Sequence, residues 1–314
     1  MKKLTEGRKM WGSVMAVFLI YAVIFILFED YDKNYLQPFE EASDWHLLVF
    51  SIAVMLLLGV LLFRYARRMD ERISREQAAK ENEMRRQLTQ NIAHELKTPV
   101  ASILGYTDTI LDNPDITEQT RQQFILRTNA QARRLTALLQ DISILNRMDY
   151  APDMLTMERV NVSELVADIV QETALAVASK QMQIHNCLPE DICIQGNWSL
   201  IYSIFRNLTD NAVNYAGEGT VVEITARRQD NCWAFTFRDN GSGVAADHLP
   251  RLFERFYRID KGRSRQMGGT GLGLAIVKNA VLLHGGQITA RNADGGGLQF
   301  DFNLRNLKEE ANKR

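Results

Sequence analysis

The chain has 314 residues, of which 46% are hydrophobic and 24% are charged, and its formal net charge is −1. These values exclude a disordered chain, a collagen-like chain and a protein that binds polyanions through a strong overall positive charge. The three cysteines include no CxxC pair, which argues against a disulfide framework and a cysteine-built zinc site and indicates a reducing compartment.

Two uncharged apolar runs predict membrane-spanning helices. Residues 11–28 contain 16 apolar residues in 18, and residues 47–63 contain 15 in 17. Each run is close to the roughly 20 residues that a helix needs to cross a bilayer. The alternatives are a signal peptide for the first run and a buried helical hairpin for both. No small-residue cleavage pattern follows the first run, and a second apolar run does, so two spans are the preferred interpretation.

The charges beside these runs predict the orientation of the spans. Residues 1–10 carry four Lys or Arg, and four Arg follow the second run, whereas residues 29–46 carry six acidic residues and one lysine. The positive-inside rule then predicts that both termini are cytoplasmic and that residues 29–46 form a short acidic extracytoplasmic loop. A loop of this length cannot fold as a separate sensor domain.

A helical hairpin is expected after the second span. Residues 64–93 are rich in helix formers and contain neither Pro nor Gly, which predicts a continuous helix whose first part, residues 64–83, is a linker. Apolar residues then follow in steps of four and three from Leu88 to Ile110, Asn113-Pro-Asp breaks the helix, and a second helix begins near Thr117. A hairpin over residues 84–150 cannot cover its own apolar face, which predicts a dimeric four-helix bundle.

An α/β sandwich is expected over residues 151–305, followed by a polar tail at 306–314. Ser163 is the expected cap of one helix, and a second helix is expected from about 198 to 215. Apolar residues alternate over 222–226, 233–237 and 298–304, which predicts strands. Helices on one face of a mixed sheet follow from this pattern.

His94 lies off the apolar stripe of the first hairpin helix, in the run Asn91-Ile-Ala-His-Glu-Leu-Lys-Thr-Pro99. A neutral imidazole is a competent nucleophile, and the carboxylate of Glu95 can accept the proton of the other ring nitrogen. Pro99 removes one helix hydrogen bond and permits a bend after the histidine. A surface histidine without a role is the alternative.

Two motifs of the second domain supply polar groups for a ligand. Asn207, Asn211 and Tyr215 recur every four residues on one helix face, and amide oxygens suit a Mg²⁺ ion that also holds phosphate. The run Asp239-Asn-Gly-Ser-Gly243 follows a strand. Its carboxylate can accept a hydrogen bond from an exocyclic amine, and its glycines permit close approach.

Two further motifs flank a polar, basic stretch at 259–267 that we expect to act as a lid. Leu252-Phe-Glu-Arg-Phe-Tyr-Arg258 precedes it, and the glycine-rich run 268–278 follows it and opens a helix. Backbone amides at a helix start suit phosphate oxygens. A Rossmann site is excluded, because the glycine run does not follow a strand within a βαβ unit.

The His94 run resembles the phosphoacceptor box of bacterial sensor histidine kinases. The four later motifs, in their order, resemble the ATP-binding domain of those kinases, which belongs to the wider family of gyrase-type, mismatch-repair and heat-shock ATPases. The resemblance covers about residues 84–305. It implies a dimerisation and phosphotransfer domain at 84–150, a Bergerat-type ATP-binding domain at 151–305, and a multi-pass protein of the plasma (inner) membrane of a bacterium.

The same resemblance implies roles for individual residues. His94 would accept the γ-phosphoryl group of ATP with Glu95 as general base, and Thr98 matches members in which this hydroxyl orients water for dephosphorylation of the partner. The remaining roles concern the nucleotide: Asn211 as Mg²⁺ ligand, Asn207 at the phosphates, Tyr215 along the base, Asp239 at the adenine amino group, Gly241 and Gly243 around that pocket, Arg258 at the γ-phosphate, and Gly269, Gly271 and Gly273 at the lid hinge and triphosphate.

These roles predict a homodimeric membrane-bound histidine kinase that uses ATP and Mg²⁺ and phosphorylates an aspartate of a response regulator receiver domain, with no nucleic acid partner. A nucleotide-gated ATPase and a nucleotide-binding membrane adaptor are the alternatives. Asn214 departs from the family pattern, since many members carry Lys there, and Lys261, Arg263 and Arg265 are candidate replacements. The expected stimulus acts within the bilayer, on the acidic loop, or through a partner membrane protein.

Overall fold

The computed structural model describes residues 22–23, 25–27, 29–31, 45–151, 154–229, 231–260 and 269–305. The chain divides into two compact units, residues 1–87 and residues 88–314. Most of the predicted first span, most of the acidic loop, the centre of the predicted lid and the C-terminal tail lie outside the described residues. The described parts of the predicted loop, 29–31 and 45–46, are helical rather than irregular.

The first unit consists mainly of the beginning of helix α2 (Trp45–Asp112). The predicted second span and the predicted linker both lie in this helix, which confirms that they are helical. Large apolar side chains at its start are exposed, including Leu56 at 65% and Phe63 at 69%. Within the described residues, none of the helices has an apolar stretch of sufficient length to cross a membrane.

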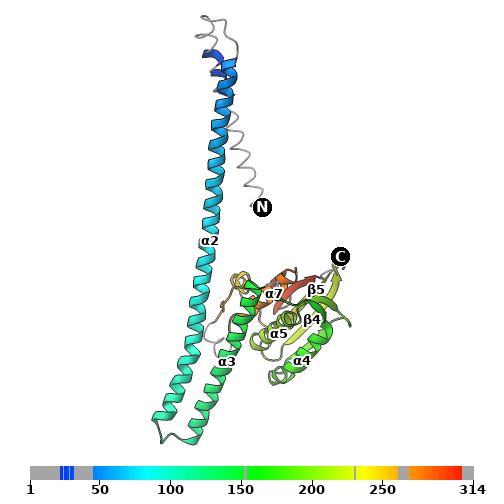
Figure 1. The fold of residues 1–314 in the computed structure, drawn as a ribbon. Coiled ribbons are helices and arrows are strands. Elements are labelled where there is room, and N and C mark those ends of the chain that lie inside the picture. The colour runs from blue at the N-terminus through cyan, green and yellow to red at the C-terminus, as the bar shows by residue number, and fades with distance from the viewer. Residues whose placement is uncertain are drawn as a thin grey trace. The chain divides into compact units, whose positions relative to one another are not determined.

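The hairpin of the second unit pairs the end of α2 with α3 (Glu118–Tyr150), as Figure 1 shows. The predicted break is confirmed, because residues 113–117 separate the helices. Thr117 caps α3 by accepting a hydrogen bond from the Thr120 amide at 3.3 Å. Tyr106 stacks on Phe124 across the hairpin, with 5.6 Å between the ring centroids.

The α/β module follows the hairpin (Figure 1). Its elements are β1 (Glu158–Asn161), α4 (Val162–Ser179), β2 (Gln183–Cys187), β3 (Cys193–Gly196), α5 (Trp198–Tyr215), β4 (Val221–Gln229), β5 (Cys232–Asp239), the 3₁₀ helix η4 (Ala246–Arg251), α7 (Gly273–Leu283), β6 (Ile288–Asn292) and β7 (Leu298–Arg305). The five-stranded sheet has the order β2-β4-β5-β7-β6, in which β2 is parallel to β4 and the other pairs are antiparallel. The predicted mixed sheet is therefore confirmed.

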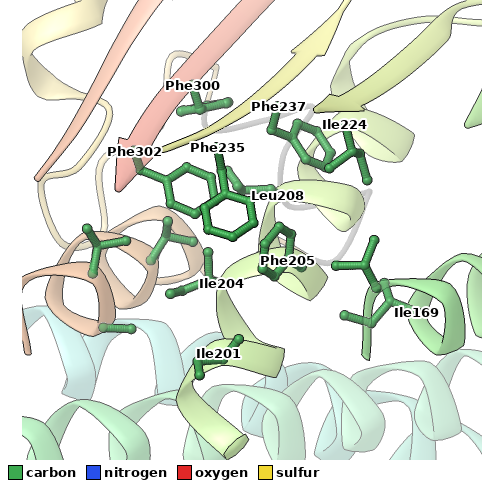
Figure 2. Packing of buried hydrophobic residues seen from close by; sticks show 14 of the residues in the cluster. Ile169, Ile201, Ile204, Phe205, Leu208, Ile224, Phe235, Phe237, Phe300 and Phe302 are labelled. Atoms are coloured by element: carbon green, nitrogen blue, oxygen red, sulfur yellow. The ribbon is translucent and has the colours of Figure 1, made fainter. Parts of the chain in front are cut away.

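Helices α4, α5 and α7 cover one face of this sheet, and the core lies between them and the strands (Figure 2). Phe205 of α5 packs edge-on against Phe235 at 5.4 Å and Phe302 at 5.7 Å, while the last two rings stack at 5.2 Å. Each of the three is at most 3% exposed. Alternating apolar residues in β4, β5 and β7 supply the sheet side of this core, as the period-2 pattern predicts.

One predicted helix cap is wrong. Asn161, rather than Ser163, caps α4, since its Oδ1 accepts hydrogen bonds from the amides of Ser163 and Glu164. The Ser163 hydroxyl instead donates to the Pro189 carbonyl and accepts from the Ile192 amide. Asn and Ser are both good helix caps. Because β1 pairs with β3 as far as Asn161, the strand ends there and α4 starts at Val162, earlier than a cap at Ser163 would allow.

Candidate functional site

His94 lies on α2 with an exposed side chain. It lines an open depression of about 450 Å³ together with Lys97, Thr98, Ala101 and Ser102. The Thr98 hydroxyl donates to the His94 carbonyl at 3.3 Å, and the Ser102 hydroxyl donates to the Thr98 carbonyl at 3.1 Å. The hydroxyl of Thr98 keeps its acceptor lone pairs, and the imidazole is open to an incoming group.

Glu95 is more enclosed than its neighbour. Its side chain is 14% exposed, and Oε2 accepts from Arg258 at 3.1 Å and from Arg134 at 3.4 Å. The two arginine side chains are 6% and 10% exposed. The two guanidinium groups therefore fix the position of this carboxylate beside His94.

The first nucleotide motif lies on α5 and faces the glycine-rich segment. The Asn207 Nδ2 donates to the Ser203 carbonyl at 2.7 Å, and a Cβ added at Gly273 would lie 2.5 Å from the Asn207 Oδ1. Gly273 is therefore needed for the approach of the two motifs. Asn211 is half-buried, and its side chain makes no hydrogen bond to the part of the chain that the structure describes. Tyr215, at the end of the helix, is 43% exposed.

Asp239 ends β5 and is 5% exposed. Its Oδ1 accepts from the Gly241 amide at 2.9 Å and from the Leu298 amide at 3.2 Å, while Oδ2 has no partner among the described residues. A Cβ at Gly241 would collide with the Ala216 carbonyl, directly after Tyr215. The second motif thus packs against the end of the first, with one fixed carboxylate oxygen available as an acceptor.

Gly243 shapes the turn after Asp239. Its φ of +66° lies in the left-handed region, and an added Cβ would lie 2.7 Å from the Asn292 Oδ1. The Asn292 side chain makes two hydrogen bonds to the backbone of Val244, the residue after Gly243. Its Oδ1 accepts from the Val244 amide at 3.0 Å, and its Nδ2 donates to the Val244 carbonyl at 2.7 Å. Sequence reasoning missed Asn292, since a single asparagine in β6 carries no local signal for this contact.

The two flanks of the predicted lid meet in the backbone. The Phe256 amide donates to the Gly271 carbonyl at 2.8 Å, and both residues have positive φ, +63° and +73° respectively. A Cβ at Gly271 would lie 3.0 Å from the Arg258 Nε. Gly269 precedes this contact, and Lys261, Arg263 and Arg265 lie outside the described residues.

Helix α7 begins beside the Asn207 motif and has no side-chain cap at its N-terminus. The first amides of a helix have no acceptor within the helix. Because no side chain caps α7 either, its first amides can bind phosphate oxygens. No group of three or more His, Cys, Asp or Glu suited to a metal occurs among the described residues. The amide of Asn211 still fits Mg²⁺, which keeps several waters and shares phosphate oxygens.

Sequence reasoning missed Arg134, which links α3 to Glu95 of α2 within the hairpin, and the pair that joins the hairpin to the module through Thr270 and Asp141. The Thr270 hydroxyl donates to the Asp141 Oδ2 at 2.7 Å. Burial raises the pKa of the Asp141 carboxyl, the hydrogen bond from Thr270 lowers it in part, and the charge of Asp210 raises it further. One signal was available: Asp141 is spaced three and four residues from buried Leu138 and Leu145, so a carboxylate occupies the apolar face of α3.

The structure brings most of the predicted site residues into two groups. Asn207 lies against Gly273, and Arg258 lies against Gly271, while Asp239 and Gly241 adjoin the end of α5. His94 and Thr98 share the open face of α2. The ion pair between Glu95 and Arg258 connects the second group to the first.

Comparison with known proteins gives two family models and many relatives. "His Kinase A (phospho-acceptor) domain" matches residues 84–151, and "Histidine kinase-, DNA gyrase B-, and HSP90-like ATPase" matches residues 196–308, so together they cover more than half of the chain. The sensor-like histidine kinase SenX3 of Mycolicibacterium smegmatis is 34% identical over 223 residues, which are 70% of this chain and 57% of SenX3. The chain thus spans little more than half the length of that relative.

Two solved structures are also similar. Full-length ShkA in complex with AMPPNP has a TM-score of 0.51 and 26% identity, and the match covers 67% of this chain and 44% of ShkA. Histidine kinase ThkA in complex with the response regulator protein TrrA has a TM-score of 0.56 and 20% identity, and the match covers 71% of this chain and 62% of that one. The second likeness concerns the fold alone.

Proposed function

Because the chain belongs to the two-component sensor histidine kinases, we propose that it phosphorylates itself on His94 with ATP and passes the phosphoryl group to an aspartate of a response regulator. One observation carries this proposal. Glu95, the neighbour of the acceptor histidine, lies 3.1 Å from Arg258, the arginine assigned to the γ-phosphate. The acceptor segment and the phosphate segment thus meet within one compact unit.

In the proposed reaction, the neutral imidazole of His94 attacks the γ-phosphorus of ATP. A nitrogen–phosphorus bond forms, the bond from that phosphorus to the bridging oxygen breaks, and ADP leaves. Glu95 accepts the proton from the other ring nitrogen, so charge does not accumulate on the imidazole. The protein's main contribution is to position the reacting groups and neutralise charge.

The nucleotide is assigned to the surface formed by the Asn207–Tyr215 face of α5, the turn after Asp239 and the start of α7. The free Oδ2 of Asp239 would accept from the adenine amino group, and Tyr215 would lie along the base. Asn207 and the first amides of α7 would contact the phosphates, with Gly241, Gly243, Gly269, Gly271 and Gly273 permitting the close approach. Mg²⁺, held through Asn211, would neutralise phosphate charge when bound.

Partners follow from the same proposal. The receiver domain of a response regulator would receive the phosphoryl group, and ThkA, which has a similar fold, forms a complex with such a regulator. A second copy of this chain would complete a four-helix bundle, since Leu104, Leu111 and Leu126 of the hairpin are 55%, 77% and 65% exposed. Thr98 would orient water if the protein also dephosphorylates its regulator.

We also propose a plasma-membrane location with two spans, at 11–28 and 47–63, and both termini in the cytoplasm. The apolar runs and the flanking arginines support it. The exposed apolar side chains at the start of α2 support it as well, because such a surface is unfavourable in water.

Incubation of the full chain with labelled ATP and Mg²⁺ tests the reaction. We expect an acid-labile, alkali-stable label that His94→Gln abolishes while AMPPNP binding persists. A label retained in His94→Gln would disprove the acceptor assignment. Nucleotide binding with hydrolysis but no labelled protein would favour a nucleotide-gated ATPase, and binding with neither reaction would favour a membrane adaptor.

A further inference from the structure

Acidic side chains of the hairpin contact the module at three places on the segments that flank the predicted lid. The pairs are Glu95 with Arg258 at 3.1 Å, Asp141 with Thr270 at 2.7 Å, and Asp149 with Arg255 at 2.9 and 2.8 Å. In each pair the hairpin supplies the acceptor, and the module supplies the donor. All three donors flank the predicted lid, before residue 261 or after residue 268.

Carboxylate and phosphate compete for the same kinds of donor. A guanidinium binds either anion through the same planar set of N–H groups, and a hydroxyl donates to either. The proposed function assigns Arg258 to the γ-phosphate and the segment of Thr270 to the triphosphate. In the structure, Glu95 and Asp141 occupy the donors that ATP would use.

Arg258 itself is only partly satisfied. Its side chain is 6% exposed, and its buried Nε has no hydrogen-bond partner in the described chain. This nitrogen lies against Gly271, on the glycine-rich side, while Nη2 reaches Glu95 on the hairpin side. Glu95 is shared with Arg134 of α3. An anion at the glycine-rich segment would therefore gain an unused buried donor, and Glu95 would keep one arginine if Arg258 left.

We propose that Glu95 and Asp141 compete with the γ-phosphate of ATP for Arg258 and Thr270, so that ATP breaks these two polar contacts between the hairpin and the module and frees Glu95 to serve His94. This inference rests on the proposed function, because it uses the same nucleotide site. Binding linkage is reciprocal: the hairpin contact lowers the affinity for ATP by the same factor by which bound ATP weakens the contact. ADP lacks the γ-phosphate, so the contact should discriminate between the two nucleotides.

The affinities of AMPPNP and ADP for the full chain, measured by calorimetry in detergent, test the competition. We expect Glu95→Gln with Asp141→Asn to raise the AMPPNP affinity about 5- to 20-fold and to change the ADP affinity less than about 2-fold. Glu118→Gln, which removes a carboxylate paired with Arg121 on the same helix α3, serves as the matched control with no effect on either. An unchanged ratio of the two affinities, or an equal rise in both, would overturn the proposal.

A charge exchange at the third pair tests the same linkage without altering the Glu95 or Asp141 contacts. Asp149→Arg should raise the AMPPNP affinity by repelling Arg255, and adding Arg255→Asp should return it toward the wild-type value. Absence of this rescue would also contradict the proposal. The ADP affinity reports that each variant is folded. If the wild-type chain binds neither nucleotide, the proposed function fails, whereas binding of both with unchanged ratios in all variants refutes only the competition.

Discussion

The core of the α/β module is mainly apolar, whereas its contact with the hairpin combines buried apolar side chains of α3 (Leu138, Leu145 and Met148) with charged and polar pairs. The core consists of stacked aromatic and aliphatic side chains that are almost fully buried, such as Phe205, Phe235 and Phe302. The contact includes single carboxylates on Arg258, Thr270 and Arg255, with exposed fractions that reach 29%. Apolar burial is strong and not selective, whereas ion pairs are weaker and exchange with other anions. The charged and polar pairs of the contact can therefore exchange while the core of the module remains packed.

The largest expected effect lies in the core. Phe235→Ala removes a ring that is 1% exposed and packs against two others, so we expect a loss of about 3–5 kcal/mol in the free energy of unfolding. Leu175→Ala, at a side chain that is 87% exposed on α4, should change it by less than about 0.5 kcal/mol. Denaturant unfolding of the full chain measures both. Equal losses would contradict the assignment of the core.

Asp239 is almost fully buried, and its carboxylate is fixed by two backbone amides while Oδ2 is left for the proposed adenine contact. Asp239→Asn keeps one oxygen for the amides of Gly241 and Leu298 but presents an amide nitrogen to the adenine amino group. We expect the ADP affinity to fall about 10- to 100-fold while the unfolding midpoint changes little. Asp168→Asn, on the exposed face of α4, is the control. An unchanged affinity would remove Asp239 from the adenine site.

The core also contains a titratable histidine, His284, which is fully buried. Its Nδ1 donates to the Ala280 carbonyl at 2.7 Å, which leaves Nε2 to accept from the Asn197 amide at 3.0 Å. Burial lowers the pKa of this imidazole below its usual value, although the carbonyl opposes the shift. Protonation would set an N–H against an N–H, so the neutral form is the one that the fold accommodates.

The folded pKa is the lower one, so the stability that His284 contributes is complete above about pH 6.5, the pKa of an unfolded histidine. It is lost as the pH falls from there toward the folded pKa, by at most about 1.4 kcal/mol per pH unit for one proton. Unfolding measured between pH 7.5 and 5.5 tests this. His284→Gln should flatten the dependence, and an unaltered slope in that variant would assign it to other groups.

The smallest expected effect lies in the contact. Asp149→Asn should lower the free energy of unfolding by about 1 kcal/mol or less, because its pair with Arg255 is partly exposed. High salt should reduce the difference between variant and wild type. A loss comparable with that of Phe235→Ala would mean that the pair of Asp149 with Arg255 stabilises the fold as strongly as the aromatic core does, which would contradict the difference described above.

Sequence reasoning succeeded where the signal was local. The alternation in β4, β5 and β7 and the hairpin break at 113–117 were read correctly, since they depend on neighbouring residues. Strands β1, β2, β3 and β6, each of four or five residues, were not identified, because a short run shows too little periodicity. The cap of α4 was placed two residues late, because two adequate caps stand close together.

The candidate site divides in the same way. Asn207, Asp239 and the glycines belong to motifs, and the structure places Gly273 against Asn207 and Gly241 against the end of α5. The pair of Glu95 with Arg258 joins residues 163 apart in sequence, and that of Asp141 with Thr270 joins residues 129 apart. Neither has a motif of its own, since each depends on how two folded elements meet.

The hydrogen bond from Phe256 to Gly271 has a consequence for how such a protein can vary. The chain leaves the module at Phe256 and is beside it again at Gly271, so the number of residues between these two points is limited only by the requirement that the chain closes. Doubling the length of a flexible closed loop costs only about 0.6 kcal/mol. Insertions and deletions between Arg258 and Gly269 should therefore be tolerated by the fold, and the length of this stretch can vary between related proteins while the Phe256–Gly271 contact is kept.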